Sequence, residues 1–180
     1  MKILVVHPYD ESTNVLEKVY SGKPVDVLHR QDLTREEVDA AIEAGNYDRV
    51  VLMGHGTPEG LCNMHTKSYV FDHGSYKNRV KPRGIEVIAI WCHANVFFLK
   101  YDDLKDVFFT GMFVSEMKEA REYIAESVDD VTIDTQFRNF ANVLRRAIDL
   151  PIGDVRKYVE ENYTGGDPVT AFNRECLGFE

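Results

Sequence analysis

The sequence predicts an α/β protein of three layers, in which a mostly parallel sheet carries helices on both faces. Apolar runs without polar alternation recur along the chain, as expected for strands that are buried on both sides. Segments with helical periodicity lie between them, and such an alternation is typical of a parallel sheet. We therefore expect a single α/β domain over residues 1–180, with the C-terminal helices of 130–163 packed on the sheet.

Five apolar runs supply the predicted strands. The first covers 3–6 and ends at His7-Pro8, because proline cannot continue a ladder of hydrogen bonds. The others cover 25–28, 49–54, 85–91 and 107–111. The run 87–91 is the most informative, because its four apolar residues are followed by an aromatic ring, a thiol and an imidazole.

A capping box marks the clearest helix. The Thr34 oxygen can accept from the amide of Glu37, and the Glu37 carboxylate can reach back to the amide of Thr34. Leu33 and Val38 are placed for a hydrophobic staple, and Gly45 stands where a left-handed residue would end the helix. We expect this helix between the second and third strands.

Other helices are expected from apolar periodicity. A short one follows Ser12 or Thr13 as its cap, and a long one ends before Pro151. The remainder are placed at about 75–81, 95–104, 116–127 and 154–163. Residues 54–67 are expected to form a loop because they hold three glycines and a proline within seven residues, and 68–71 form a short strand or a lid.

Composition limits the classes of partner and location. A formal charge of −9 argues against nucleic acid and anionic membranes, which both attract basic surfaces. The first apolar run is too short for a signal peptide, and no run is long enough to cross a bilayer. Three cysteines without a CxxC motif favour a reducing compartment, so we expect a cytoplasmic protein.

Reactive side chains follow two of the predicted strands. Cys92 comes directly after the run 85–91, and His55-Gly56 follows the run 49–54. Ligands of open α/β sheets bind beyond the carboxyl ends of the strands, so these residues are expected to face one another. A thiol with a nearby base and a glycine amide as oxyanion donor is an arrangement for nucleophilic catalysis.

An apolar strand ending in His-Gly, followed by an apolar strand ending in Cys, resembles the clan CD cysteine peptidases, which include caspases, legumains and gingipains. The resemblance covers residues 1–128 in the order of elements, and its motif rests on His55, Gly56 and Cys92. It implies a caspase-hemoglobinase fold with Cys92 as nucleophile, His55 as base and Gly56 as oxyanion donor. The strings 54–58, 91–95 and 111–116 also resemble a family of bacterial proteins, a likeness that implies no activity.

Two positions depart from the pattern of those peptidases. Trp91 precedes the cysteine, where they commonly have a small or acidic residue, and His93 follows it, where they often have glycine or serine. Both departures bear on the substrate pocket. We expect Trp91 to line that pocket together with acidic residues from two other strand ends, which would select Lys or Arg in a peptide. These acidic residues are Asp10, Glu11 and Glu116.

Other interpretations use the same residues. Cys92 can be a buried apolar side chain, since free cysteine is among the most buried residue types. A zinc site is a second alternative, with ligands drawn from His7, His55, Cys62, His65, Cys92 and His93. A third is a caspase-like module that has lost activity and only binds a partner. The glycine-rich string 54–60 lacks the spacings of phosphate-binding loops.

The sequence thus predicts a cysteine-dependent, peptidase-like hydrolase that uses a Cys92–His55 dyad. Its expected partner is a peptide or protein substrate, without nucleic acid or membrane, and no cofactor is implied. The inactive binding module and the zinc-dependent hydrolase remain the alternatives.

Overall fold

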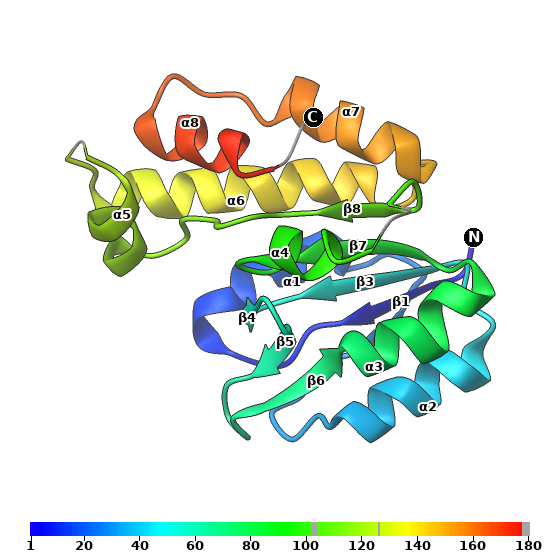
Figure 1. Ribbon diagram of the computed structural model, residues 1–180. Helices are drawn as coiled ribbons and strands as arrows, with labels where there is room; N and C mark the ends of the chain where they lie inside the picture. The colour runs from blue at the N-terminus through cyan, green and yellow to red at the C-terminus, as the bar shows by residue number, and fades with distance from the viewer. Residues whose placement is uncertain (102–103, 126, 178–180) are drawn as a thin grey trace.

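The computed structural model describes residues 1–101, 104–125 and 127–177. Its central sheet has five strands, all parallel, in the order β2-β1-β3-β7-β8. The strands are β1 (Ile3–Val6), β2 (Asp26–Leu28), β3 (Arg49–Met53), β7 (Glu86–Ile90) and β8 (Val107–Phe109). The predicted α/β class is confirmed, and the arrangement is consistent with a three-layer caspase-like fold (Figure 1).

Helices cover one face of the sheet from both ends of the chain. Val5, Val51 and Ile88 point to this face and share a core with Phe140 and Leu144. The covering elements are α1 (Glu17–Tyr20), α6 (Asp130–Ala147) and α7 (Ile152–Asn162). Because side chains alternate along a strand, residues of the same strands supply a second core on the other side.

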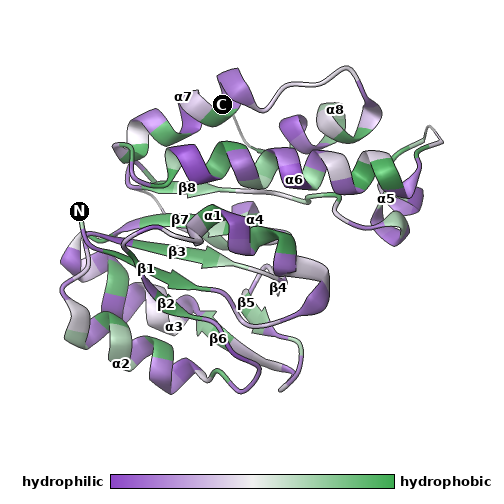
Figure 2. Ribbon diagram, turned by 180° about the vertical axis from the view of Figure 1, so that it is seen from behind, coloured by the Kyte–Doolittle hydropathy of each residue, from purple (hydrophilic) through white to green (hydrophobic). Residues whose placement is uncertain are grey.

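The opposite face is covered by elements from the middle of the chain. Leu4, Val50 and Val87 point to it and share a core with Val38 and Ile42. The covering elements are α2 (Arg35–Gly45), α3 (His73–Ser75) with its continuing turns Tyr76–Val80 and Lys81–Arg83, and α4 (Ala94–Phe98). Figure 2 shows the central strands mostly in the hydrophobic colour and the outer sides of α2 and α6 mostly hydrophilic.

A second, antiparallel sheet lies beyond the carboxyl ends of the central strands, where the prediction of a loop over 54–67 is wrong. It joins β4 (Gly56–Thr57), β5 (Gly60–Asn63) and β6 (Ser68–Asp72) in that order. Gly60 makes the tight pairing feasible, because its φ of 149° is left-handed and a Cβ there would lie 2.1 Å from the Phe71 carbonyl oxygen. The glycines therefore serve a hairpin rather than a loop.

Helix ends agree with the sequence where a local cap decides them. The capping box of Thr34 and Glu37 begins α2 as predicted, but the left-handed residue that ends this helix is Asn46, not Gly45. The first helix is capped by Asp10 rather than Ser12 or Thr13, and its opening turn, Glu11–Leu16, is a 3₁₀-helix.

The C-terminal third holds two more helices, α5 (Met117–Tyr123) and α8 (Pro168–Glu175). The sequence signalled α5 but not α8. Of the predicted helices over 95–104 and 116–127, positions 102–103 and 126 lie outside the described residues. Across the part of the chain that the structure describes, we find no helix with the length and hydrophobicity needed to cross a membrane.

A buried arginine ties the sheet to α6. The Arg49 side chain is fully buried at the start of β3, where its Nε donates to the Glu86 carboxylate at 2.9 Å. Its remaining donors reach the carbonyl oxygens of Ile148 at 2.5 Å and Leu150 at 2.7 Å. Those carbonyls follow the end of α6, so the guanidinium satisfies main-chain acceptors that the helix leaves unpaired.

Candidate functional site

The strand order defines where a ligand would be expected. Going from β1, the chain places β2 on one side and β3 on the other, so the direction of winding reverses between β1 and β3. At such a switch point the loops after the two strands part and leave a crevice at the carboxyl ends. Here the loops are the segment after His7 and the segment after Met53.

Three polar side chains meet in this crevice. The Ser12 hydroxyl donates to Oδ1 of Asp10 at 2.6 Å and lies 2.7 Å from Nε2 of His55. The same imidazole nitrogen lies 3.3 Å from Asp10 Oδ1. Because the hydroxyl has one proton and gives it to Asp10, the imidazole donates from Nε2 in this arrangement.

The Asp10 carboxylate is held in its charged form. Its burial alone would raise the pKa, but hydrogen bonds from the Ser12 hydroxyl and amide, together with the electrostatic interaction with His55, outweigh this and lower the pKa of Asp10. The Ser12 amide bond, at 3.0 Å, also makes Asp10 the cap of the following 3₁₀-helix. Asp10 is therefore both a structural cap and an anionic group in the crevice.

Main-chain contacts fix His55 in place. Gly54, whose φ is 136°, turns the chain at the end of β3, and its amide donates to the Ile90 carbonyl of β7 at 3.0 Å. The His55 carbonyl accepts from the amide of Cys62 at 2.8 Å. The imidazole is thus positioned by a rigid turn between the two sheets.

An open hollow of about 460 Å³ adjoins this cluster. It is lined by Asp10 and Ser12 and by polar groups from the loops after β2 and β5. The lining residues from those loops are Gln31, Met64 and His65, with Tyr9 and Glu11 completing the wall. A hollow of this volume is large enough for a small polar ligand.

Cys92 lies at the end of β7, where its sulfur contacts residues other than His55. Its sulfur is 3.8 Å from the carbonyl oxygen of Phe113 and 4.0 Å from Oε1 of Glu119. Burial, with smaller contributions from the nearby carboxylates of Glu119 and Glu116, raises the pKa of the Cys92 thiol to about 11. At neutral pH this sulfur is therefore a protonated thiol, which is not an effective nucleophile.

The space between His55 and Cys92 is small. Both residues line a cavity of about 30 Å³, together with Thr13, Trp91 and Glu119. This volume admits about one water molecule.

Gly56 and Trp91 pack against each other in the structure. The sequence analysis predicted an oxyanion donor at Gly56 and a pocket-lining role for Trp91, and it did not anticipate this contact. A Cβ at residue 56 would lie 2.0 Å from Cδ1 of Trp91. The Trp91 ring is 2% exposed, and its indole N–H donates to the Thr57 carbonyl at 3.1 Å. The glycine thus makes room for the indole, and Trp91 packs in the core beneath β4.

The acidic residues that were predicted to line one substrate pocket lie at two separate places. Asp10 and Glu11 line the open hollow after β1, whereas Glu116 occupies the N-cap position of α5. The carboxylate that does face Cys92 belongs to Glu119, which also accepts from the amide of Ser115 at 2.8 Å. These positions do not form one specificity pocket beside Cys92.

Sequence reasoning missed two residues of the site. Glu119 is three residues after the N-cap of α5, the position from which a glutamate reaches back to the main chain, and this spacing could have identified it. Ser12 is two residues after Asp10, a spacing typical of an aspartate that caps its own turn. Neither signal indicates by itself that the side chain faces a crevice.

His7, which follows the first strand, makes its contacts in the protein interior. His7 is fully buried, and its ring nitrogens lie 3.1 Å from the hydroxyls of Tyr20 and Thr13. His93 has a left-handed φ of 68° and begins α4. In residues 1–101, 104–125 and 127–177 no three His, Cys, Asp or Glu side chains are grouped so that they could hold a metal ion.

Comparisons with known proteins bear on the activity. No family model matches the chain. The chain is similar to a curated protein of Archaeoglobus fulgidus named probable serine/threonine-protein kinase BUD32 homolog, with 27% identity over 109 residues. The match covers 59% of this chain and 54% of that protein, so the chain spans about half the length of the relative it matches.

The prediction of a cysteine-dependent, peptidase-like hydrolase is wrong. The chain is similar instead to a protein whose name is that of a probable kinase. The geometry is consistent with this, because the half-buried Cys92 thiol lies beside the Glu119 carboxylate while His55 contacts Ser12 and Asp10. The descriptions hydrolase and cysteine peptidase are therefore wrong.

Proposed function

We propose that this chain binds a magnesium–nucleoside triphosphate in the crevice after β1 and β3 and transfers its terminal phosphoryl group to a hydroxyl. The observation that carries the proposal is the contact of Asp10, Ser12 and His55 at the switch point, beside an open hollow of about 460 Å³. The similarity to a protein named as a probable kinase supports the same class of chemistry.

The charge of the crevice favours a metal-bound phosphate over a free one. Asp10 and Glu11 both line the hollow, and Asp10 already caps the turn whose amides would otherwise attract an anion. Mg²⁺ typically binds one or two carboxylates together with substrate phosphates and several waters. In this proposal Asp10 would hold the metal that neutralises the triphosphate, and no glycine-rich phosphate loop would be required.

Metal binding would also change the hydrogen-bond acceptor of the Ser12 hydroxyl. In the ligand-free geometry the Ser12 proton is given to Asp10. A cation on Asp10 would compete for that carboxylate, and the hydroxyl would then donate to the imidazole nitrogen, which lies 2.7 Å away. His55 would take the proton of the hydroxyl that receives the phosphoryl group, while the nucleoside diphosphate leaves. The Ser12 hydroxyl, 2.7 Å from the imidazole, is a candidate for that hydroxyl.

Titration calorimetry and label transfer test this proposal. The purified chain is titrated with ATP in the presence of Mg²⁺ and again in EDTA, and transfer from γ-labelled ATP to Ser12 is followed by peptide mapping. We expect binding that depends on Mg²⁺ and is weakened about tenfold or more in Asp10→Asn, because the metal loses a charged ligand. Label transfer should be lost in Ser12→Ala and in His55→Gln.

Matched controls are exposed residues outside the crevice. Asp32→Asn removes a carboxylate whose side chain is 83% exposed, and Ser68→Ala removes an exposed hydroxyl of β6. Both should leave binding and transfer unchanged. Absence of ATP binding at millimolar concentration, or equal binding by wild type and Asp10→Asn, would refute the proposal.

The scaffold and the location remain proposals too. We infer from the order of elements a scaffold related to clan CD, without its peptidase activity. A cytoplasmic location is supported by the three cysteines, which are all free thiols. A peptide or protein substrate stays a prediction.

A further inference from the structure

His7 is a buried polar residue that the proposed reaction does not use. It is fully buried directly after β1, and each of its ring nitrogens lies 3.1 Å from a hydroxyl, Nδ1 from that of Tyr20 and Nε2 from that of Thr13. Burying a polar ring is costly unless its polar atoms are paired, and an apolar side chain would fill the same space without that cost. The imidazole is therefore explained by its hydrogen bonds rather than by its packing.

The hydroxyl of Thr13 gives these hydrogen bonds a direction. It has one proton, and it donates to the main-chain carbonyl of Asp10 at 3.3 Å. In its contact with His7 the imidazole must therefore donate from Nε2 and the hydroxyl accept. A neutral imidazole with its proton on Nε2 accepts at Nδ1, so the Tyr20 hydroxyl donates there. Three hydrogen bonds thus run in one direction from Tyr20 through His7 and Thr13 to Asp10.

The surroundings of His7 keep this direction fixed. Burial and the charge of nearby His29 lower the pKa of His7 to about 3, so its ring stays neutral near pH 7. The ring of His29 stacks on that of His7 with their centroids 4.7 Å apart. Nδ1 of His29 donates to the His7 carbonyl at 2.7 Å. Both the orientation and the protonation of His7 are therefore determined by its neighbours.

Asp10, at the end of this chain of hydrogen bonds, is the residue that the proposed function assigns to the metal. Its carbonyl accepts from the amide of Thr13, at 3.1 Å, as well as from the hydroxyl. Its carboxylate accepts at Oδ1 from the Ser12 amide and hydroxyl and lies within 3.3 Å of Nε2 of His55. In the described part of the chain all hydrogen bonds of this carboxylate go to Oδ1, so Oδ2 is left for a cation in the hollow.

We propose that His7 and Thr13 are positioning residues for Asp10, and that the hydrogen bonds from Tyr20 to Asp10 hold its carboxylate towards the crevice. His7 and Thr13 contact neither the nucleotide nor the metal and act through the main chain of Asp10. Their effect on nucleotide binding rests on the proposed function, whereas their effect on the turn after β1 does not.

Hydrogen exchange of the Ser12 amide tests the positioning role without any ligand. Thr13→Val removes the hydroxyl and keeps the shape of the side chain, whereas Thr13→Ser keeps the hydroxyl. Because the Ser12 amide donates to Asp10, we expect it to exchange about tenfold faster in Thr13→Val than in the wild type. Thr13→Ser should exchange at the wild-type rate.

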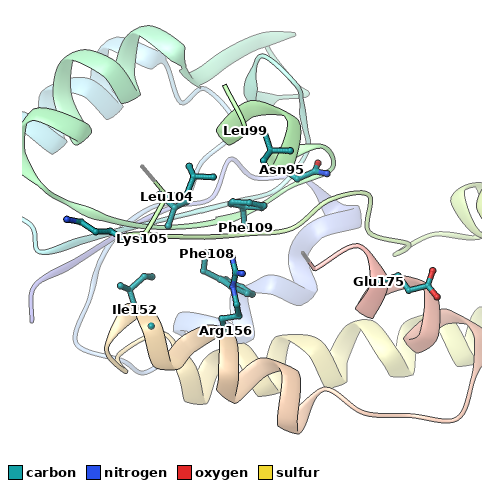
Figure 3. Close-up of a pocket in the computed structure, with 11 residues that line it drawn as sticks. Asn95, Leu99, Leu104, Lys105, Phe108, Phe109, Ile152, Arg156 and Glu175 are labelled. Carbon is teal, nitrogen blue, oxygen red and sulfur yellow. The ribbon is translucent and has the colours of Figure 1, made fainter. Parts of the chain in front are cut away.

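Thr170 provides a matched control. It is fully buried, it follows its cap Asp167 by the same spacing as Thr13 follows Asp10, and its hydroxyl donates to Asp167 at 2.8 Å. It lies in α8, the helix whose Glu175 lines a different hollow, of about 550 Å³ along β8 (Figure 3). Thr170→Val should lower stability in urea and leave the exchange of the Ser12 amide unchanged.

Nitrogen-15 NMR of the imidazole measures the direction of the hydrogen bonds. At neutral pH we expect Nε2 of His7 to carry the proton and Nδ1 to be unprotonated. A proton on Nδ1 would mean that Thr13 donates to His7 and not to Asp10, and this result would overturn the inference.

Calorimetry with ATP then connects the positioning role with the proposed function. In the presence of Mg²⁺ we expect Thr13→Val to bind ATP about tenfold more weakly than the wild type, and Thr13→Ser to bind it with wild-type affinity. In EDTA the three proteins should not differ.

The two hypotheses fail in different ways. Faster exchange of the Ser12 amide in Thr13→Val, without ATP binding by the wild type, would contradict the proposed function and support the positioning role. Binding that depends on Mg²⁺, with unchanged exchange and unchanged affinity in Thr13→Val, would overturn the positioning role and support the proposed function.

Discussion

Trp91 and Gly56 form a close contact that joins the central sheet to the antiparallel one. A Cβ on Gly56 would lie 2.0 Å from the indole Cδ1, and the indole N–H donates to the carbonyl of Thr57. The same glycine that suggested an oxyanion donor is therefore required by the space that the neighbouring ring occupies.

Gly56→Ala should destabilise the fold by about 1–3 kcal/mol, because the new methyl group overpacks a rigid contact. Urea unfolding followed by the fluorescence of Trp91, the one tryptophan of the chain, measures the effect. The matched control is Gly153→Ala in α7, where the Cβ has open space and the helix should gain about 1 kcal/mol. Equal stability of Gly56→Ala and wild type would contradict the packing argument.

Cys92 should react slowly with iodoacetamide at pH 7. Burial raises its pKa to about 11, so only a very small fraction is thiolate. Peptide mapping after timed labelling compares it with Cys62 and Cys176, whose thiol pKa values are also raised by burial but by less. We expect Cys92 to be modified last. Labelling of Cys92 ahead of the other two would restore the case for a reactive thiol.

Arg49→Ala should be strongly destabilising, by about 3–5 kcal/mol, because it leaves Glu86 without its partner and the carbonyls of Ile148 and Leu150 without donors. Urea unfolding at neutral pH gives the value. Arg138→Ala removes an exposed ion pair within α6 and should change stability by less than about 1 kcal/mol. Similar effects of both substitutions would argue against a stabilising role of the Arg49 contacts.

The stability of the protein should depend on His7 at acid pH. Burial, reinforced by the charge of nearby His29, lowers the pKa of His7 from 6.5 to about 3. Between these values the unfolded chain binds a proton that the native chain does not. The free energy of unfolding therefore decreases as the pH falls from about 6.5 towards 3, by up to about 1.4 kcal/mol per pH unit.

Denaturant unfolding of His7→Gln at several pH values tests this linkage, because the amide cannot bind that proton and the slope should decrease. His65→Gln, at an exposed position, is the control and should retain the wild-type slope. An unchanged slope in His7→Gln would assign the acid sensitivity to other groups.

Features encoded over a few residues were predictable. The run Ile3–Val6 is a buried strand because its residues have apolar partners on both faces, and the box of Thr34 and Glu37 begins α2 through bonds between neighbours. The β5 strand was not predictable in this way. Its existence depends on pairing with β6 and on the left-handed φ of Gly60, which the chain adopts only once the partner strand is in place.

The site was predicted in its location but not in its contacts. The strand ends bring His55 and Cys92 to the lining of one cavity. Which group each side chain meets is decided by turns, since Gly54 directs the imidazole towards Ser12 and the loop after Phe109 places a carbonyl on the thiol. Such orientations depend on tertiary packing, and spacing along the sequence does not specify them.

The core that Phe140 and Leu144 share with Ile3 and Val5 has a consequence for biosynthesis. The last strand ends at Phe109 and α6 begins at Asp130, so a nascent chain exposes one apolar face of its sheet until α6 and α7 have been synthesised. Such exposed apolar surface promotes aggregation and attracts chaperones. Chains released early, before α6, would retain that surface, and protein quality control would be expected to remove them.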